Sequence, residues 1–286
     1  MCFRPVLVLS VFTVCLSFSC GSWAQIAAEC EGTSIPEDYD EEKQQAHLNN
    51  YFAAGFIMTP MSPIQPFQGN QQASAGLELG LIPPLSCQER LVLGGSKTED
   101  TNKLPVNPRP RLVASLPSLG PVQLYSGFTL MPPIEIPEVG SILQAGMELA
   151  AYYPMSSGLT VGTRMHLNFT RVKAEIATPF VEGTTAYDDL FYASSMGVDF
   201  GAAYNLKKAD YSWMTPYASI GIADISTLFI VGDDLVVTQN VIYPWWGALV
   251  AAGFQFMILG NIEIIAEVST ASPVLTTGKL KLAYQW

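Results

Sequence analysis

Hydrophobic and polar residues alternate along most of the chain after residue 71. The clearest stretch, from Leu159 to Thr170, has apolar residues at most odd-numbered positions and Arg164, His166 and Asn168 at even-numbered ones. Successive side chains of a β-strand point to opposite faces, so this stretch predicts a strand with one apolar and one polar face. The same period recurs in residues 72–82, 122–131, 142–153, 192–204, 246–258 and 262–269. The pattern predicts an all-β protein built mainly from hairpins.

Strand length separates two architectures that share this alternation, a secreted β-sandwich and a transmembrane β-barrel. Most of the alternating stretches cover 10 or more residues. A tilted transmembrane strand needs about 9–11 residues, whereas sandwich strands commonly have about 5–6. The polar rows are rich in Gly, Ala and Ser, which suits the bore of a barrel. Aromatic residues near the expected strand ends are typical of the girdles at the lipid interfaces; these are Tyr153, Tyr192, Tyr204, Tyr217, Trp245, Trp246, Tyr284 and Trp286.

The end of the chain has the same two-faced pattern. Leu280, Leu282, Tyr284 and Trp286 share one face of the last strand, and Lys279 and Lys281 lie on the other. An amphipathic final strand that ends in an aromatic residue resembles the assembly signal of Gram-negative outer-membrane β-barrel proteins. The resemblance covers about residues 70–286 and implies a closed antiparallel barrel with two partners, the barrel-assembly machinery and outer-membrane lipid. Because an unpaired backbone group in hydrocarbon costs several kcal/mol, the last strand is expected to pair with the first, near residues 72–82.

The barrel is expected to have about 12 strands, within a range of 10 to 14. This number follows from dividing residues 71–286 by roughly 18 residues for each tilted strand and its connection. A segment before a barrel of about 12–14 strands is similar in outline to the long-chain fatty-acid transporter family. The Asn-Pro-Ala stretch of that family is absent, so no ligand residues are assigned from the resemblance.

The first 24 residues have the pattern of a cleaved signal peptide. Arg4 precedes an apolar run of 13 residues, and small residues at Ser22 and Ala24 predict cleavage after Ala24. The run is too short for a transmembrane helix. Export therefore leads to the outer membrane of a Gram-negative bacterium. Lipidation of Cys20 is a second option, although Ser17-Phe18-Ser19 makes a poor lipobox.

Residues 25–70 differ from the barrel region, residues 71–286. Residues 36–47 are acidic and polar, so this segment is either a short periplasmic leader or a plug in the barrel mouth. Cys30 and Cys87 are the two cysteines left after the signal peptide. In an oxidising compartment they predict a disulfide, with two unpaired thiols as the alternative. The disulfide would close a long loop and is worth roughly 4 kcal/mol in the loop-entropy model.

Charged residues on the polar faces are the candidate bore-lining residues. The chosen set is Glu78, Glu148, Arg164, His166, Asn168, Asp199, Glu263, Glu267, Lys279 and Lys281. A change of parity after Thr170 predicts a bulge or tight hairpin that also turns Arg171, Lys173 and Glu175 inward. The proline-rich residues 94–110 are expected as a long outer loop. Charges in the bore either neutralise one another or form a constriction that selects solutes.

The sequence offers little catalytic chemistry. His166 is the only histidine in the strand region, and a hydrolase would need Ser195 or another nucleophile beside it. No metal site, cofactor motif or phosphate loop is present, and a net charge of −11 disfavours nucleic acid as a partner. We expect no enzyme. The expected function is a passive channel or transporter for small or hydrophobic solutes. The alternatives are a plugged structural or adhesive barrel and, less favoured, a membrane-embedded hydrolase.

Overall fold

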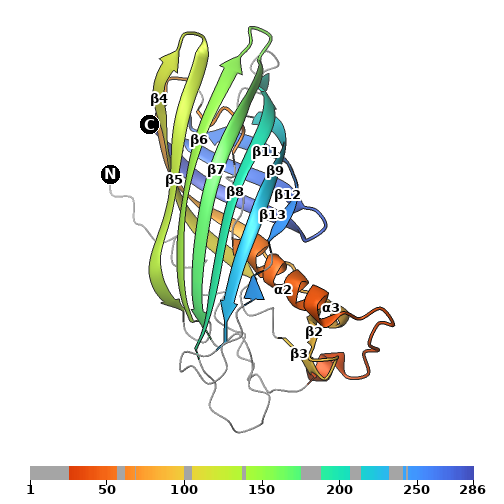
Figure 1. Cartoon of the computed structure of the whole chain (residues 1–286). Helices are drawn as coiled ribbons and strands as arrows, with labels where there is room; N and C mark the ends of the chain where they lie inside the picture. The colour runs from red at the N-terminus through yellow and green to blue at the C-terminus, as the bar shows by residue number, and fades with distance from the viewer. Residues whose placement is uncertain are drawn as a thin grey trace.

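Ten long strands form a closed antiparallel barrel (Figure 1). The computed structural model describes residues 26–56, 62–67, 69–99, 105–136, 140–174, 188–206, 214–231, 241–242 and 244–286. The expected signal peptide and Cys20 lie outside these residues. The final strand, β13, pairs with the first, β1, so no edge of the barrel remains open. The resemblance to Gram-negative outer-membrane β-barrel proteins is confirmed at the level of fold.

The elements follow the chain in simple order. The barrel strands are β1 (Ala73–Leu81), β4 (Val106–Leu119), β5 (Val122–Ile136), β6 (Gly140–Pro154), β7 (Leu159–Ala174), β8 (Asp189–Tyr204), β9 (Met214–Ile230), β11 (Trp245–Ile258), β12 (Ile262–Ala271) and β13 (Leu275–Gln285). The short β10 (Val241–Ile242) pairs with β9, and β2 (Leu91–Val92) pairs with β3 (Lys97–Thr98). The helices are η2 (Ala28–Cys30), α2 (Glu41–Phe56) and α3 (Cys87–Arg90). No helix of the described part of the chain is long and apolar enough to cross a membrane.

The barrel has ten strands rather than about 12. Strands β4 to β9 and β11 have 14 to 17 residues each. With their connections, these strands use on average more than the roughly 18 residues assumed for each strand and connection. Residues 82–105, between β1 and β4, contain no barrel strand among their described residues. Both features reduce the number of strands that the same length can form.

The apolar rows point away from the bore. Phe128 is 60 %, Ile220 61 % and Leu282 59 % exposed, while Glu78 is 2 % and His166 1 % exposed. Leu167 and Phe254 belong to the same outward rows. An apolar outer face and a polar inner face are the arrangement of a barrel immersed in lipid.

Three expectations about orientation are wrong. Strand β7 pairs with β6 and β8 without a register shift, so there is no bulge after Thr170. Arg171 is exposed and Lys173 is partly exposed, because both continue the outward row of β7; Glu175 lies outside the described residues. Tyr217 is buried and points into the bore rather than joining the aromatic girdle.

Strand β4 begins within the stretch that was expected to be a loop. The long polar stretch that ends at Pro110 was expected to be a loop, and proline also removes a ladder hydrogen bond. The backbone N–H of Ser115 donates to the carbonyl of Gln72 on the β1 side, so the N–H groups of odd-numbered β4 residues point toward β1. Pro108 and Pro110 are even-numbered, so the N–H groups that they lack would have pointed toward β5. Paired residues of β4 and β5 begin only at Arg111 and Thr129. The prolines therefore lie where no donor is needed.

The two ends of the barrel differ in their connections. The end that holds the C terminus has residues 120–121, 155–158, 205–213 and 259–261 between strands. The opposite end has residues 82–105, 137–139, 175–188, 231–244 and 272–274. Figure 1 shows α2, α3, β2 and β3 together at this second end, away from the C terminus. We call these the short-turn end and the long-loop end.

Candidate functional site: the barrel lumen

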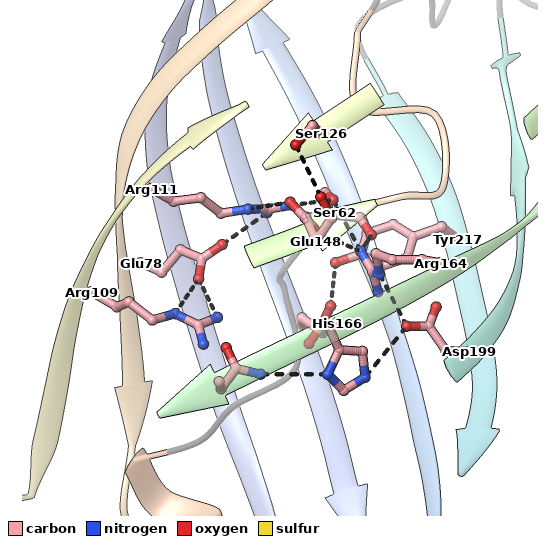
Figure 2. A network of polar contacts seen from close by, with 12 residues as sticks. Ser62, Glu78, Arg109, Arg111, Ser126, Glu148, Arg164, His166, Asp199 and Tyr217 are labelled. Atoms are coloured by element: carbon pink, nitrogen blue, oxygen red, sulfur yellow. Dashed lines mark hydrogen bonds and ion pairs between the residues drawn. The ribbon is translucent and has the colours of Figure 1, made fainter. Parts of the chain in front are cut away.

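A belt of buried charges crosses the bore at mid-height (Figure 2). Glu78 on β1 accepts hydrogen bonds from Arg109 Nε at 2.8 Å and from Arg111 Nη1 at 2.9 Å, both on β4. Arg111 Nε also donates to Glu148 on β6 at 2.9 Å. Each arginine side chain is almost fully buried, and each guanidinium contacts at least one carboxylate. These contacts link strands β1, β4 and β6.

The belt continues onto β7 and β8. Arg164 Nη1 lies 3.9 Å from Glu148 Oε2, and Arg164 Nε donates to Asp199 Oδ2 at 3.0 Å. Arg164 and Asp199 are direct partners in the register of β7 and β8. Facing residues of neighbouring strands approach within about 5 Å at Cβ, so this register brings the two charges together.

A glycine makes room for the contact that skips a strand. Arg111 and Glu148 lie on β4 and β6, with Gly127 of β5 between them. A Cβ at Gly127 would lie 2.0 Å from Glu148 Oε1. Glycine has no Cβ, which allows the close approach of a neighbouring group. The glycine-rich polar rows of the sequence thus serve the packing of large charged side chains.

A second group of ion pairs joins β12 and β13. Lys279 Nζ lies 3.1 Å from Glu267 Oε1, and Lys281 Nζ lies 2.8 Å from Glu263 Oε2. The carboxylates have further donors, since Tyr217 OH donates to Glu267 Oε2 at 2.8 Å and Gln255 Nε2 to Glu263 Oε1 at 2.6 Å.

Most charges of the described bore are paired. Five buried carboxylates, Glu78, Glu148, Asp199, Glu263 and Glu267, share it with five buried cations, Arg109, Arg111, Arg164, Lys279 and Lys281. A sixth buried carboxylate, Asp189, is the first residue of β8. A buried charge without a partner would cost several kcal/mol, whereas a paired and hydrogen-bonded one is tolerated. The bore wall therefore satisfies its own charges.

His166, the residue that a hydrolase would use, is buried beside a small cavity. His166 Nε2 is 4.0 Å from Asp199 Oδ2, and Asn168 Nδ2 is 3.4 Å from His166 Nδ1. Ser195 and Lys279 line the same cavity, whose volume is about 30 Å³. This space holds roughly two water molecules. The described residues contain no group of three or more metal-ligating side chains suited to a metal ion.

Residues 62–67, which lie between α2 and β1 in the sequence, are inside the bore. Ser62 Oγ accepts hydrogen bonds from Arg111 Nη2 at 3.2 Å and from Arg164 Nη1 at 3.3 Å. Nearer the short-turn end, Thr160 Oγ1 donates to Gln65 Oε1 at 2.7 Å. The carbonyl of Pro66 accepts from Gln255 Nε2 at 3.1 Å and from Gln285 Nε2 at 2.9 Å. Residues 62–67 thus contact opposite sides of the wall.

Residues 62–67, which we call the threaded segment, also make apolar contacts with the wall. Ile64 and Phe67 form a buried cluster with Val113, Tyr125, Ala150 and Tyr152. Ile64 lies directly over Gly162 and Gly201, where a Cβ would approach Ile64 to 2.7 and 3.1 Å. The wall is therefore shaped to receive the segment as well as its own side chains.

Helix α2 enters the long-loop end of the bore. Its last turns contain Tyr51, Ala53 and Ala54, which pack in a core cluster with Ile142, Val172, Phe191, Ile225 and Leu275 of the wall. Trp245, expected in the interfacial girdle, packs against this cluster. The carbonyl of Gly55 accepts a hydrogen bond from Asn107 Nδ2 at 3.2 Å.

The first half of α2 belongs to a small cap at the long-loop end, which we define as residues 26–47 and 82–99. Cys30 and Cys87 are joined by a disulfide with Cα atoms 5.3 Å apart. Asp40 caps α2 by accepting from the backbone N–H groups of Glu42 and Lys43. Arg90 forms an ion pair with Glu29 at 3.0 Å.

A carboxylate fixes the helix to the β2–β3 turn. Glu41 accepts from the backbone N–H groups of Leu93 and Gly94, both at 2.9 Å, and from Tyr39 OH at 2.6 Å. Leu93 and Gly94 both have positive φ, and consecutive N–H groups in such turns form a nest for anions. Partial burial raises the pKa of Glu41, but these donors outweigh it and hold the pKa below its usual value.

Sequence reasoning missed the residues that connect the belt. Arg109 and Arg111 were placed in or beside the expected loop because the stretch up to Pro110 is polar, although Asn107, Arg109 and Arg111 already alternate. The threaded segment also left a signal. No Asp, Glu, Lys or Arg occurs between Lys43 and Glu78, a neutral stretch suited to a bore whose charges are already paired.

No protein-family profile and no curated protein sequence matches the chain. Solved outer-membrane proteins are similar at low levels. The attachment invasion locus protein Ail of Yersinia pestis is 12 % identical, covering 75 % of this chain and 98 % of its own, with a TM-score of 0.32. The Pseudomonas putida toluene transporter TodX is 13 % identical, covering 81 % and 70 %, with a TM-score of 0.36. The translocator domain of NalP from Neisseria meningitidis is 6 % identical, covering 77 % and 90 %, with a TM-score of 0.41.

Proposed function

We propose that this chain is a non-conducting outer-membrane barrel that is closed by its own amino-terminal segment and serves as an anchor for the cap. The single observation that carries the proposal is the position of Ser62 between Arg111 and Arg164 in the middle of the bore. A passive channel, which the sequence favours first, needs a continuous path of water along this axis. Residues 62–67 and the end of α2 occupy that path.

The wall supports the same conclusion. Ten strands enclose little more space than the eight that side chains alone can fill, and here large charged side chains extend inward from both halves of the wall. A selective constriction usually presents charges of one sign. In this bore five carboxylates are paired with five cations across strands, and Asp189 is the one further buried carboxylate of the described wall, so the charges form no ring of one sign.

The proposal includes no catalysis. His166 and Asp199 lie beside a cavity of about 30 Å³, which has no room for a lipid or peptide substrate. Ester or peptide turnover that is lost in His166→Ala, with the barrel still folded, would contradict this part of the proposal.

Single-channel recording in planar bilayers tests the proposal. The wild-type barrel should be silent over a wide voltage range, and a variant that lacks residues 26–68, and therefore has neither α2 nor residues 62–67 in the bore, should give discrete conductance steps. The matched control replaces residues 62–67 with a Gly-Ser sequence of equal length, which should give brief and irregular openings because it keeps the chain but loses Ile64 and Phe67. Folding of each variant is checked by the shift in gel mobility on heating.

Two results would overturn the proposal. Stable conductance of the wild-type protein would show that the bore is open despite the threaded segment. A folded deletion variant that stays silent would show that the wall alone closes the bore and that residues 62–67 have no such role.

A further inference from the structure

The amino-terminal segment and the C terminus lie at opposite ends of the barrel. Trp286 is at the short-turn end, where its carbonyl accepts from the backbone N–H of Gln72 at 2.8 Å. The cap is at the long-loop end and contacts the β1–β4 connection through the Cys30–Cys87 disulfide. With ten strands the two ends of the barrel domain itself, β1 and β13, start and finish on the same side. The chain before β1 must therefore cross to the other side.

The contacts of the threaded segment trace this crossing in order. Gly55 contacts Asn107 at the start of β4, near the long loops. Ser62 lies at the arginine belt, and Pro66 contacts Gln285 at the end of β13. Gln71 Nε2 then donates to the Gly260 carbonyl, in the turn between β11 and β12. The described contacts thus run one way, from the long-loop end to the short-turn end.

The orientation of the barrel in the membrane decides which side of the membrane each end of this path reaches. Outer-membrane barrels have short turns in the periplasm and longer loops outside the cell. Here the connections at the long-loop end include residues 82–105, 175–188 and 231–244. We propose that the chain crosses the outer membrane once inside its own barrel, so that residues 26–47 are displayed outside the cell while the C terminus stays in the periplasm.

The disulfide fits this arrangement. Cys30 is fully buried in the cap, and its bond to Cys87 joins the displayed segment to an external loop. The pair can form in the oxidising periplasm before the barrel closes. The amino-terminal segment and the β1–β4 connection would then pass to the outside as one covalently joined unit.

Epitope accessibility on intact cells tests the proposal. One epitope follows Gly32, an exposed residue of an open turn, and a matched epitope follows Gly120 in the short β4–β5 turn. An antibody added to intact cells should bind the first epitope, and it should bind the second only after the outer membrane is permeabilised. The reverse pattern, or binding of both only after permeabilisation, would overturn the proposal.

The unmodified chain offers a second measurement if an insertion prevents folding. Cells are reduced and then treated with a maleimide on a polyethylene glycol chain too large for porins. Labelling of Cys87, which is partly exposed, on intact cells supports external display, and labelling only after permeabilisation contradicts it. The inference rests on the outer-membrane location but not on closure of the bore, so the conductance test and the labelling test can fail separately.

Discussion

The wall of the barrel and the segment that fills it use opposite chemistry. Ten buried charges of the described bore-facing wall are each paired with an opposite charge on another strand. The described residues of the segment inside the bore, 48–56 and 62–67, carry none. The wall is held by strand register and ion pairs, and the segment by neutral hydrogen bonds, apolar contacts and a disulfide outside the bore. The two parts should therefore respond differently to the same kind of change.

The largest effect should come from removing one charge of the wall. Arg111→Met leaves Glu78 without one of its two arginines and Glu148 with only the more distant Arg164. We expect the free energy of unfolding to fall by about 3–5 kcal/mol, because buried carboxylates lose their partner. Denaturant unfolding in detergent micelles measures it.

The matched control for this change is Arg171→Met. Arg171 lies on β7 and is exposed on the outer side, so its loss should cost less than about 0.5 kcal/mol. Equal losses in the two variants would mean that the buried belt contributes nothing beyond a surface charge.

The next largest effect should be confined to the cap. Replacing both cysteines, in Cys30→Ser with Cys87→Ser, releases the loop that the disulfide closes and should destabilise the cap by about 2–4 kcal/mol. Limited proteolysis should then cut within residues 26–47, while the barrel unfolds at the same denaturant concentration as before. A lower unfolding midpoint for the barrel would show that wall and cap are not independent.

A smaller effect is expected from the contact between segment and wall. Ser62→Ala removes one hydroxyl, but Arg111 and Arg164 keep their carboxylate partners. The free energy of unfolding should fall by only about 1 kcal/mol, the usual net value of one hydrogen bond. If the free energy of unfolding fell as much as in Arg111→Met, Ser62 would belong to the ion network. The contrast between a charged wall and a neutral segment would then be wrong.

The smallest effect should be the pH dependence of cap stability that comes from Glu41 and the N–H groups of Leu93 and Gly94. Because the pKa of Glu41 is lowered in the folded state, its contribution to stability is present above its ordinary value of 4.5 and is lost as the pH falls through the lowered pKa. Wild-type cap should therefore become more sensitive to acid-active proteases below that pH, and Glu41→Gln should be sensitive throughout. Glu42→Gln, one residue along and exposed, should behave as wild type.

The sequence predicted the two faces of the strands well, because each residue's side is decided by local alternation. It placed Lys279 and Lys281 opposite Glu263 and Glu267, where the structure also has them. It did not predict the strand number, which depends on how far each strand extends beyond the membrane. It left the segment before the barrel open between a periplasmic leader and a plug in the barrel mouth, since occupying a bore depends on the shape of the whole wall.

The neutral stretch between Lys43 and Glu78 also has a consequence for assembly. We expect this part of the chain to move past the buried ions as the strands close. A charged side chain would be caught by each opposite ion in turn, with Coulomb energies of roughly 4 kcal/mol at close range. A neutral segment meets no such attraction, so it can shift along the bore until Ile64 packs against Gly162 and Gly201.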